Sequence, residues 1–330
     1  MNSPVRTACI TGTGSYVPER VLTNAELEKL VETSDEWILT RTGIKERRIA
    51  RPDEPTSLMA AEAARRALTA AGITAEQVDL IIVATITPDM GFPCTACFVQ
   101  REIGARNAFC YDLEAACSGF VFALDTACQY VASGRVETVL VIGAEKISCI
   151  TDWTDRSLCV LFGDGAGAAV VQARPDRRGI LGSVLRSDGR LSELLKLPGG
   201  GSRYPASEET IRQKLHFMKM DGKEVFKHAV TSMTDVAKRV LTQAGVTLEQ
   251  VKLVIPHQAN MRIVNAIRDR LGGRDDQYFI NLERYGNTSA ASVILALDEA
   301  AKAGRLERGD LVLLVAFGGG FTWGATLLEW

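Results

Sequence analysis

Short, unbroken runs of aliphatic residues alternate along this chain with longer stretches whose apolar residues recur at helical spacing. The clearest runs are residues 80–84, 138–142, 253–255 and 311–315. Runs of this kind, rich in β-branched residues, are typical of strands in a sheet that is covered on both faces. The Ala-rich stretches 57–71 and 288–303 have the pattern of helices. The alternation predicts an α/β fold.

One segment of this pattern occurs twice. Residues 71–82 read AGITAEQVDLII, and residues 244–255 read AGVTLEQVKLVI, which is an offset of 173. The four residues from Gly134 also match the four from Gly304, in each case before a strand and at an offset of 170. Two matches in the same order at nearly the same offset indicate an internal duplication. Shared turn chemistry at helix–strand junctions is the alternative explanation.

The duplication divides the chain into two similar halves, residues 1–175 and 176–330. The polar segment 174–178 is the expected junction between them. A helix is expected to open at Cys117 in the first half, and its counterpart in the second half opens within 287–290. Equivalent helix starts in two pseudo-symmetric halves would face each other across the shared interface. We therefore expect the functional site there.

Composition narrows the class of protein. The 330 residues are 46% hydrophobic and 24% charged, which excludes a disordered chain. Lys and Arg number 38 against 40 Asp and Glu, so the net charge of −2 provides no global attraction to nucleic acid. No apolar run approaches the roughly twenty residues of a membrane span, and the first residues lack the layout of a secretory signal. We expect a soluble cytoplasmic protein that binds neither nucleic acid nor membrane.

Eight cysteines all lie in the N-terminal half, mostly within apolar runs. Without a secretory signal they are expected to be reduced and buried rather than paired in disulfides. Cys94 and Cys97 have the spacing of half a zinc site, but no second pair follows and the chain has only three histidines. The sequence therefore predicts no metal centre.

One of these thiols stands where a strand is expected to turn into a helix. Cys117 follows the apolar strand 108–112 and precedes Ser118 and Gly119. The first turn of a helix presents unpaired N–H groups and the positive end of the helix dipole. These groups can lower the pKa of a thiol from ~8.5 towards neutrality. Cys117 is therefore a candidate nucleophile.

Two further residues occupy positions that suit catalysis. His257 directly follows the strand 253–255, and strand ends often carry catalytic residues in open α/β sheets. His216 and His228 have polar or amphipathic neighbours and are expected at the surface. Asn287 lies in a turn before a helix of small residues, where an N-cap is its default role.

Glycine-rich segments exclude some functions and permit another. Residues 317–324 follow a strand and contain three consecutive glycines, whose N–H groups can face a developing oxyanion. No Gly-Lys-Ser/Thr follows, so this is not a phosphate loop. The glycines of 163–167 lack the dinucleotide spacing and predict a tight turn before a strand at 168–171. The absence of a Gly-x-Ser-x-Gly elbow argues against a serine hydrolase.

Taken together, Cys117, His257 in Pro-His-Gln-Ala-Asn, Asn287 in Gly-Asn-Thr-Ser and the triple-glycine loop resemble the 3-oxoacyl-[acyl-carrier-protein] synthase III family. The resemblance covers essentially the whole chain. It implies a thiolase-like duplicated α/β fold, layered αβαβα, with two pseudo-symmetric halves. Degradative thiolases carry a second cysteine in the final glycine loop, where this chain has Phe317. Elongating condensing enzymes have a second histidine where this chain has Asn287, so the pattern is that of an initiating enzyme.

The resemblance implies that the protein initiates bacterial-type fatty acid synthesis. Cys117 would attack an acyl-CoA primer and hold the acyl group as a thioester. His257 and Asn287 would donate hydrogen bonds to the enolate that forms when malonyl-acyl carrier protein loses CO₂. The backbone N–H groups of Cys117 and Gly319 would bind the tetrahedral oxyanion. No cofactor is implied, since the coenzyme A thioester is a substrate.

The resemblance also implies a set of contacts to the substrate. Those to coenzyme A and its pantetheine arm are Trp37, Arg41, Arg156, Met220, Gly222, Phe226 and Asn260. A Trp–Arg pair suits a flat heterocycle, which can stack between an indole and a guanidinium. Phe92 would reach into the acyl pocket across the interface of a homodimer.

An acidic carrier protein requires a basic docking surface, which the nearly neutral chain does not supply globally. The candidates are Arg262, Arg268 and Arg270 on a predicted helix, with Lys223 and Lys227 near the pantetheine segment. A solvated helix face is the alternative explanation for these charges.

Three other functions stay open. A starter-unit condensing enzyme or acyltransferase of a polyketide or quinolone pathway can keep the same three catalytic residues, so these residues do not separate it from a fatty acid synthase. A carrier-protein-binding module without catalysis is disfavoured because all three catalytic residue types are present. A cysteine hydrolase is disfavoured because nothing in the sequence positions a water molecule.

Overall fold

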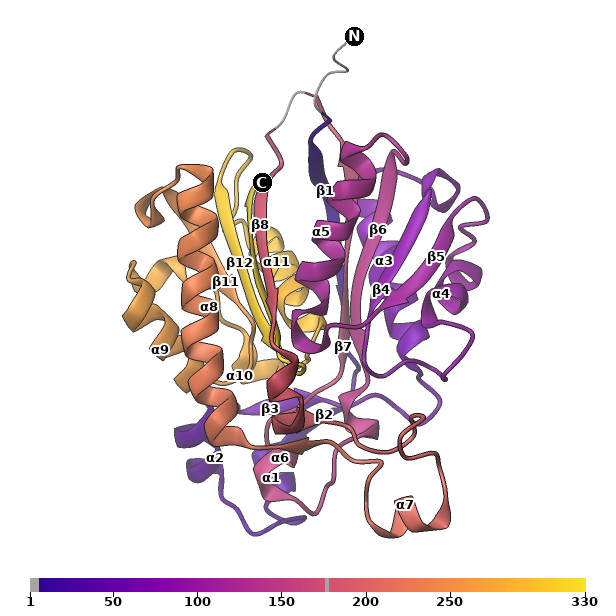
Figure 1. The fold of residues 1–330 in the computed structure, drawn as a ribbon, viewed down its shortest axis with the longest axis vertical. Helices are drawn as coiled ribbons and strands as arrows, with labels where there is room; N and C mark the ends of the chain where they lie inside the picture. Colours follow the sequence, from indigo (N-terminus) through magenta and orange to yellow (C-terminus); the bar gives the residue numbers. More distant parts are fainter. Residues whose placement is uncertain (1–5, 176–177) are drawn as a thin grey trace.

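Two β-sheets form the frame of the computed structural model, which describes residues 6–175 and 178–330 (Figure 1). The first sheet has the strand order β1-β7-β6-β4-β5 and the second has the order β11-β12-β13-β8. The strands of the first sheet are β1 (Ala8–Tyr16), β4 (Leu80–Ala84), β5 (Phe109–Leu113), β6 (Thr138–Glu145) and β7 (Gly165–Ala173). Those of the second are β8 (Ile180–Ser187), β11 (Val251–Pro256), β12 (Leu311–Gly318) and β13 (Thr322–Glu329). The expected junction at 174–178 includes residues 176 and 177, which lie outside the described residues.

Both sheets are built in the same way. β1 runs antiparallel to β7, β7 runs antiparallel to β6, and β6 and β4 are parallel. In the second sheet β8, β13, β12 and β11 repeat these relations in the same order. A parallel bridge between Val254 and Tyr278 stands where β5 pairs with β4 in the first sheet. The repeated topology confirms that the fold consists of two pseudo-symmetric halves.

Helices complete a five-layered structure. α3 (Thr56–Ala71) and α4 (Thr95–Ile103) pack on the outer face of the first sheet, and α8 (Gly222–Ala244) and α9 (Met261–Leu271) pack on that of the second (Figure 1). α5 (Gly119–Ala132) and α11 (Ala291–Lys302) lie between the sheets, in one apolar core that includes Leu124 and Leu297. The layers therefore follow the expected αβαβα order.

The repeated sequence encodes the same helix end in both halves. α3 ends at Gly72 and α8 at Gly245, with φ values of 67° and 65°, in the left-handed region that favours glycine. A capping box follows each glycine, at 74–77 and at 247–250. The chain then enters β4 or β11. The shared turn chemistry thus occurs at equivalent positions of two equivalent sheets, as a duplication requires.

Short elements connect these layers. Figure 1 shows α1, α2, α6, α7, β2 and β3 gathered at one end of the two sheets. The short strands and helices are β2 (Val21–Thr23), α1 (Asn24–Leu27), α2 (Asp35–Thr42), β3 (Glu46–Arg48), α6 (Arg156–Cys159), β9 (Leu195–Lys196), α7 (Glu208–Arg212), β10 (Lys219–Met220) and α10 (Leu282–Tyr285). The 3₁₀ turns are η1 (Ala75–Gln77), η2 (Ala116–Ser118), η3 (Ile147–Cys149), η4 (Gly189–Leu194), η5 (Leu248–Gln250) and η6 (Asp275–Gln277). Across the described residues, no helix has both the length and the apolar character needed to cross a bilayer.

One turn predicted from sequence is wrong in part. β7 begins at Gly165, so the second half of the glycine segment 163–167 is strand rather than turn. A Cβ atom at Gly167 would lie 2.5 Å from Cγ2 of Ile294. These glycines therefore let α11 pack closely on β7, and a turn is not their main purpose.

Candidate active site

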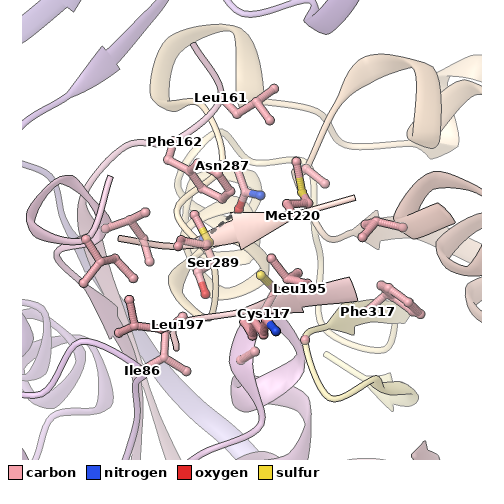
Figure 2. A pocket seen from close by; sticks show the side chains of 18 of the residues that line it. Ile86, Cys117, Leu161, Phe162, Leu195, Leu197, Met220, Asn287, Ser289 and Phe317 are labelled. Atoms are coloured by element: carbon pink, nitrogen blue, oxygen red, sulfur yellow. Dashed lines mark hydrogen bonds between the residues drawn. The ribbon is translucent and has the colours of Figure 1, made fainter. Parts of the chain in front are cut away.

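A cavity of about 1410 Å³ lies where α5 and α11 begin, and residues from both halves of the chain line it (Figure 2). Cys117, His257 and Asn287 all contribute to its wall. The structure thus brings to one cavity three side chains that lie in three separate turns of the sequence. Much of the remaining wall is apolar, including Leu195, Met220 and other labelled side chains of Figure 2.

Cys117 lies in the 3₁₀ turn η2, just before α5, and it is buried. The preceding residue, Ala116, has a φ of +46°, which turns the chain sharply from β5 towards the helix. The end of β12 crosses close by, because a Cβ atom at Gly318 would lie 2.6 Å from the backbone nitrogen of Cys117. Only glycine fits this close approach of two backbones.

The turn before α11 repeats this geometry in the second half. Ser289 lies 173 residues after Ala116 and has a φ of +49°. Ala290 therefore occupies the position that corresponds to Cys117. The two helix starts pack closely, since a Cβ atom at Gly119 would lie 3.4 Å from Cβ of Ala290. This contact explains why residues at both starts reach the same cavity.

His257 follows β11 and is held at both its backbone and its side chain. Its N–H donates to the carbonyl of Val315 (2.7 Å), and its Nδ1 is 2.6 Å from the hydroxyl of Ser292 on α11. Burial lowers the pKa of His257 to about 3, so the imidazole is neutral. A Ser292 hydroxyl that donates to Nδ1 leaves the ring proton on Nε2.

Asn287 has its carboxamide oriented by the turn that contains it. Its Oδ1 accepts a hydrogen bond from the N–H of Ser289 (2.8 Å), as drawn in Figure 2. Its backbone N–H donates to the carbonyl of Leu161 (2.8 Å), and its carbonyl accepts from the N–H of Gly163 (3.1 Å). Because Oδ1 is engaged by the turn, the Nδ2 group is the end of the carboxamide that can donate to a ligand.

A buried carboxyl group lies behind the two turns. Glu145, at the end of β6, is fully buried, and its Oε1 accepts from the hydroxyl of Ser289 (2.9 Å). Its Oε2 accepts from the hydroxyls of Thr87 (2.6 Å) and Thr85 (3.1 Å) and from the N–H of Ile86 (3.1 Å). Burial raises the pKa of Glu145 to about 7, although these hydrogen bonds oppose the rise.

The pKa of Cys117 does not follow the expectation that the helix start activates the thiol. Burial raises the pKa of Cys117 to about 12, while contact with the Ser289 hydroxyl opposes the rise and the charge of Glu145 adds to it. His257 offers no compensating positive charge, because it is neutral. Removal of the thiol from water therefore outweighs the favourable helix terminus, and Cys117 and His257 are a neutral pair at rest.

Most of the residues expected to contact substrate line the same cavity. They are Trp37, Arg41, Met220, Gly222, Phe226, Asn260 and Gly319, together with Lys223 and Arg262 from the predicted docking set. Asn260 caps α9 through a hydrogen bond from the N–H of Arg262 (2.8 Å) and also donates to the carbonyl of Arg41 (3.1 Å). These bonds hold α2 and α9 together at the cavity wall.

Arg156 reaches this region through Trp37. Its guanidinium lies over the indole, 4.8 Å from the ring centre, and its Nη1 donates to the carbonyl of Glu32 (2.7 Å). The guanidinium and the indole are therefore in direct contact. A flat ring placed between them would require two stacking distances, about 7 Å in total.

Four other predicted residues do not contribute to the cavity wall as far as the chain is described: Phe92, Lys227, Arg268 and Arg270. Phe92 is 86% exposed and points away from the chain's own core. Lys227 lies 3.7 Å from the carboxylate of Glu224, and Arg268 lies 3.2 Å from that of Asp275. His216 is exposed and His228 is half-buried, which agrees with the surface position expected for both.

Sequence reasoning missed the residues that hold the catalytic side chains in place. Glu145 is an acidic residue at the end of a mostly apolar strand, and Ser289 and Ser292 are polar residues at the start of an apolar helix. A polar residue in such a segment is the one sign in the sequence that it has a special role. Their partners, however, lie far away in the chain and are known only from the fold.

Comparison with known proteins connects the chain to one family. Family models described as "3-Oxoacyl-[acyl-carrier-protein (ACP)] synthase III" and its "C terminal" part match residues 111–189 and 241–330. A beta-ketoacyl-[acyl-carrier-protein] synthase III of Caldanaerobacter subterraneus subsp. tengcongensis is 55% identical over 323 residues, which are 98% of each chain.

Solved structures lead to the same family. The crystal structure of 3-oxoacyl-[acyl-carrier-protein] synthase III from Aquifex aeolicus has a TM-score of 0.92 at 51% identity, covering 98% of this chain and 100% of that one. The priming beta-ketosynthase of the R1128 polyketide pathway also has a TM-score of 0.92, at 38% identity, covering 100% of this chain and 98% of that one. The chain therefore belongs to the 3-oxoacyl-[acyl-carrier-protein] synthase III family of condensing acyltransferases.

Proposed function

We propose that this enzyme condenses a short or branched acyl-CoA primer with malonyl-acyl carrier protein, using Cys117 as nucleophile and His257 and Asn287 as enolate-binding residues. The observation that carries the proposal is that all three side chains line one cavity of about 1410 Å³ at the junction of the two halves. This volume exceeds the range of ~300–1,000 Å³ that is usual for small-ligand sites. It can therefore hold an acyl group together with a pantetheine arm.

In the first half-reaction the Cys117 sulfur attacks the thioester carbonyl and the C–S bond to coenzyme A breaks. The proton of the buried thiol ends on the sulfur of the departing coenzyme A, so that no charge remains in the cavity. The high pKa of Cys117 fits a mechanism in which the thiol loses its proton during attack rather than before it. The N–H groups of Cys117 and Gly319 stabilise the tetrahedral oxyanion, a contribution of ~3–4 kcal/mol for one such donor.

In the second half-reaction the malonyl thioester loses CO₂ and becomes an enolate. A neutral His257 with its proton on Nε2 and the Nδ2 group of Asn287 donate hydrogen bonds to the enolate oxygen. A neutral donor suits this task because a neutral imidazole can polarise a carbonyl in enolising enzymes. The enolate carbon then attacks the acyl-cysteine, the C–S bond breaks, and the 3-oxoacyl product is released. The Cys117 thiolate that leaves takes a proton from solvent, which restores the thiol.

Coenzyme A binding is proposed along one wall of the cavity. Met220, Gly222, Phe226 and Asn260 would contact the pantetheine arm, and Arg41 would meet a phosphate. The adenine would stack against Trp37. Because Arg156 already lies on that indole, the ring either displaces the guanidinium or stacks beside the pair.

We propose that the enzyme acts in the cytoplasm as a homodimer. The free thiols fit a reducing compartment. β5 is an edge strand that begins at the exposed Phe109, and the exposed Phe92 precedes α4, which packs on β5. Both features favour coverage of this edge by a second copy. Sedimentation analysis should show dimers for the natural chain and monomers for Phe92→Asp. Monomers of both proteins would contradict the proposal.

A starter-unit enzyme of a polyketide pathway is the less favoured alternative. The R1128 priming ketosynthase is 38% identical, whereas several synthases of the III type exceed 50%. A primer panel of acetyl-, isobutyryl- and longer acyl-CoA with malonyl-acyl carrier protein tests the choice, with products resolved by mass. Cys117→Ser is expected to abolish covalent labelling by radioactive acetyl-CoA and to spare part of the malonyl decarboxylation. Full condensing activity in that variant would rule out the nucleophile assignment.

A further inference from the structure

Three half-buried cysteines outside the catalytic machinery bring their sulfur atoms together beside the cavity. The Sγ atoms of Cys94 and Cys97 are 3.4 Å apart, and those of Cys97 and Cys110 are 3.6 Å apart. All three sulfur atoms lie within 4.8 Å of one another, and all three residues are free thiols. The pair noticed in the sequence therefore has a third partner, which only the fold supplies.

Secondary structure fixes this arrangement without help from a ligand. Cys94 is the N-cap of α4, Cys97 lies in its first turn, and Cys110 lies on the neighbouring strand β5. The carboxylate of Asp112, also on β5, accepts hydrogen bonds from the N–H groups of Thr95 (2.6 Å) and Ala96 (2.8 Å). The start of α4 is thus bound to the strand that carries the third sulfur, and the cluster is preorganised.

We propose that Cys94, Cys97 and Cys110 form a binding site for a thiophilic divalent cation, with Zn²⁺ as its natural occupant. A tetrahedral Zn²⁺ with Zn–S bonds of ~2.3 Å places its sulfur ligands about 3.8 Å apart. The separations of 3.4 and 3.6 Å approach this value, so shifts of a few tenths of an ångström would suffice. The amide oxygen of Gln100, 3.9 Å from the Cys110 sulfur, or a water molecule can complete the tetrahedron.

A nearby carboxylate group favours the binding of a cation at this cluster. Asp112 lies on β5 two residues after Cys110, and its carboxylate group faces the start of α4. Each thiol that binds the metal releases its proton to solvent. The negative charge of Asp112 attracts the incoming Zn²⁺.

Zinc binding is tested on the full-length protein in a Cys117→Ser background, so that the nucleophile cannot contribute a ligand. The reduced protein is titrated with Zn²⁺ against a chromophoric chelator, with Co²⁺ absorption as a second probe of thiolate ligation. We expect one Zn²⁺ per chain, bound more tightly than ~1 µM. Cys97→Ser and Cys110→Ser should each weaken binding at least ~100-fold, since loss of even an outer-shell partner costs 10–100-fold. Cys149→Ser, which removes an exposed thiol outside the cluster, is the matched control and should bind as before.

Alkylation of the natural chain provides a readout that does not depend on variants. Zn²⁺ should protect Cys94, Cys97 and Cys110 together from iodoacetamide, as measured by peptide mass, and leave the labelling of Cys149 unchanged. Unchanged affinity in Cys97→Ser, or no stoichiometric uptake by the natural chain, would overturn the proposal. A protein that takes up no Zn²⁺ when reduced, and that forms a Cys94–Cys97 disulfide when oxidised by air, would overturn it as well.

Discussion

At the residue scale, Ser289 connects the two halves of the catalytic site. Its left-handed backbone places its N–H on the carboxamide oxygen of Asn287, and its hydroxyl donates to Glu145 and also contacts the thiol of Cys117. In the proposed mechanism, one small residue thus orients a donor for the second half-reaction and touches the nucleophile of the first. A motif search finds Cys117 and Asn287, because their residue types carry the chemistry, but it does not find the residue that holds them.

Ser292 should matter for condensation through the tautomer of His257. Replacement by Ala removes the partner of Nδ1, so the ring can rotate and the proton no longer stays on Nε2. We expect Ser292→Ala to lower the rate of malonyl decarboxylation and condensation roughly tenfold to a hundredfold, less than the ~10²–10³-fold loss expected for the donor itself. Acyl transfer to Cys117, measured separately with radioactive acetyl-CoA, should change little. An equal loss in both half-reactions would contradict a role through His257.

Glu145 should make stability depend on pH. Its pKa is about 7 in the folded protein and 4.5 as the reference value, so the folded state holds a proton more firmly than the unfolded state does. Stability from this group is therefore full below pH 4.5 and is lost as the pH rises to 7, by ~3 kcal/mol in total. Glu145→Gln cannot ionise and should lack this loss.

The measurement is the free energy of unfolding in urea for both proteins between pH 5 and pH 8. The amide in Glu145→Gln loses some hydrogen bonds at every pH. The informative quantity is therefore how the difference in unfolding free energy between the two proteins changes with pH. The natural chain should lose stability relative to Glu145→Gln as the pH increases. A constant difference would show that the carboxyl group of Glu145 does not titrate in this range.

At the element scale, the close approach of the end of β12 to η2 sets the position of the proposed nucleophile. A Cβ atom at Gly318 would meet the Cys117 nitrogen at 2.6 Å, and neither backbone can move away without disturbing its strand or helix. Gly318→Ala should therefore destabilise the fold by ~1–3 kcal/mol and lower the rate of acyl transfer at least tenfold. The matched control is Gly182→Ala in β8, where a Cβ atom meets nothing within 4 Å. Similar activity in both variants would contradict this account.

The sequence predicted the boundaries of helices and strands wherever residues at the boundary itself determine them. The ends of α3 and α8 are marked by glycines in the left-handed region, and both were readable as a repeat. The start of β7 could not be predicted from the sequence, because its glycines are required by close packing against Ile294 of the opposite half. The prediction of a lowered pKa for Cys117 failed for a similar reason. The burial that raises this pKa depends on elements from later in the chain that cover the turn.

At the scale of the whole molecule, the duplication was the most informative feature of the sequence. It predicted two equivalent halves whose helix starts meet, and the central position of α5 and α11 follows from it. The surface was less predictable, because a periodic pattern of charges does not tell which face of a helix borders a cavity. Arg262 lines the cavity and stacks on Phe226, whereas Arg270 donates to Thr231 on α8.

This division of the basic residues makes the docking of the acidic carrier protein testable. Arg262 borders the cavity into which the pantetheine arm is proposed to enter. Arg268, on the same helix, is instead paired with Asp275 of η6. Arg262→Glu should raise the KM for malonyl-acyl carrier protein several-fold, because it reverses a charge beside the entry, and the effect should shrink as salt screens the attraction. The KM for acyl-CoA should change less, and Arg268→Glu should leave both values near those of the natural enzyme. Equal effects of the two substitutions would indicate a general loss of positive charge rather than a docking site at the cavity entrance.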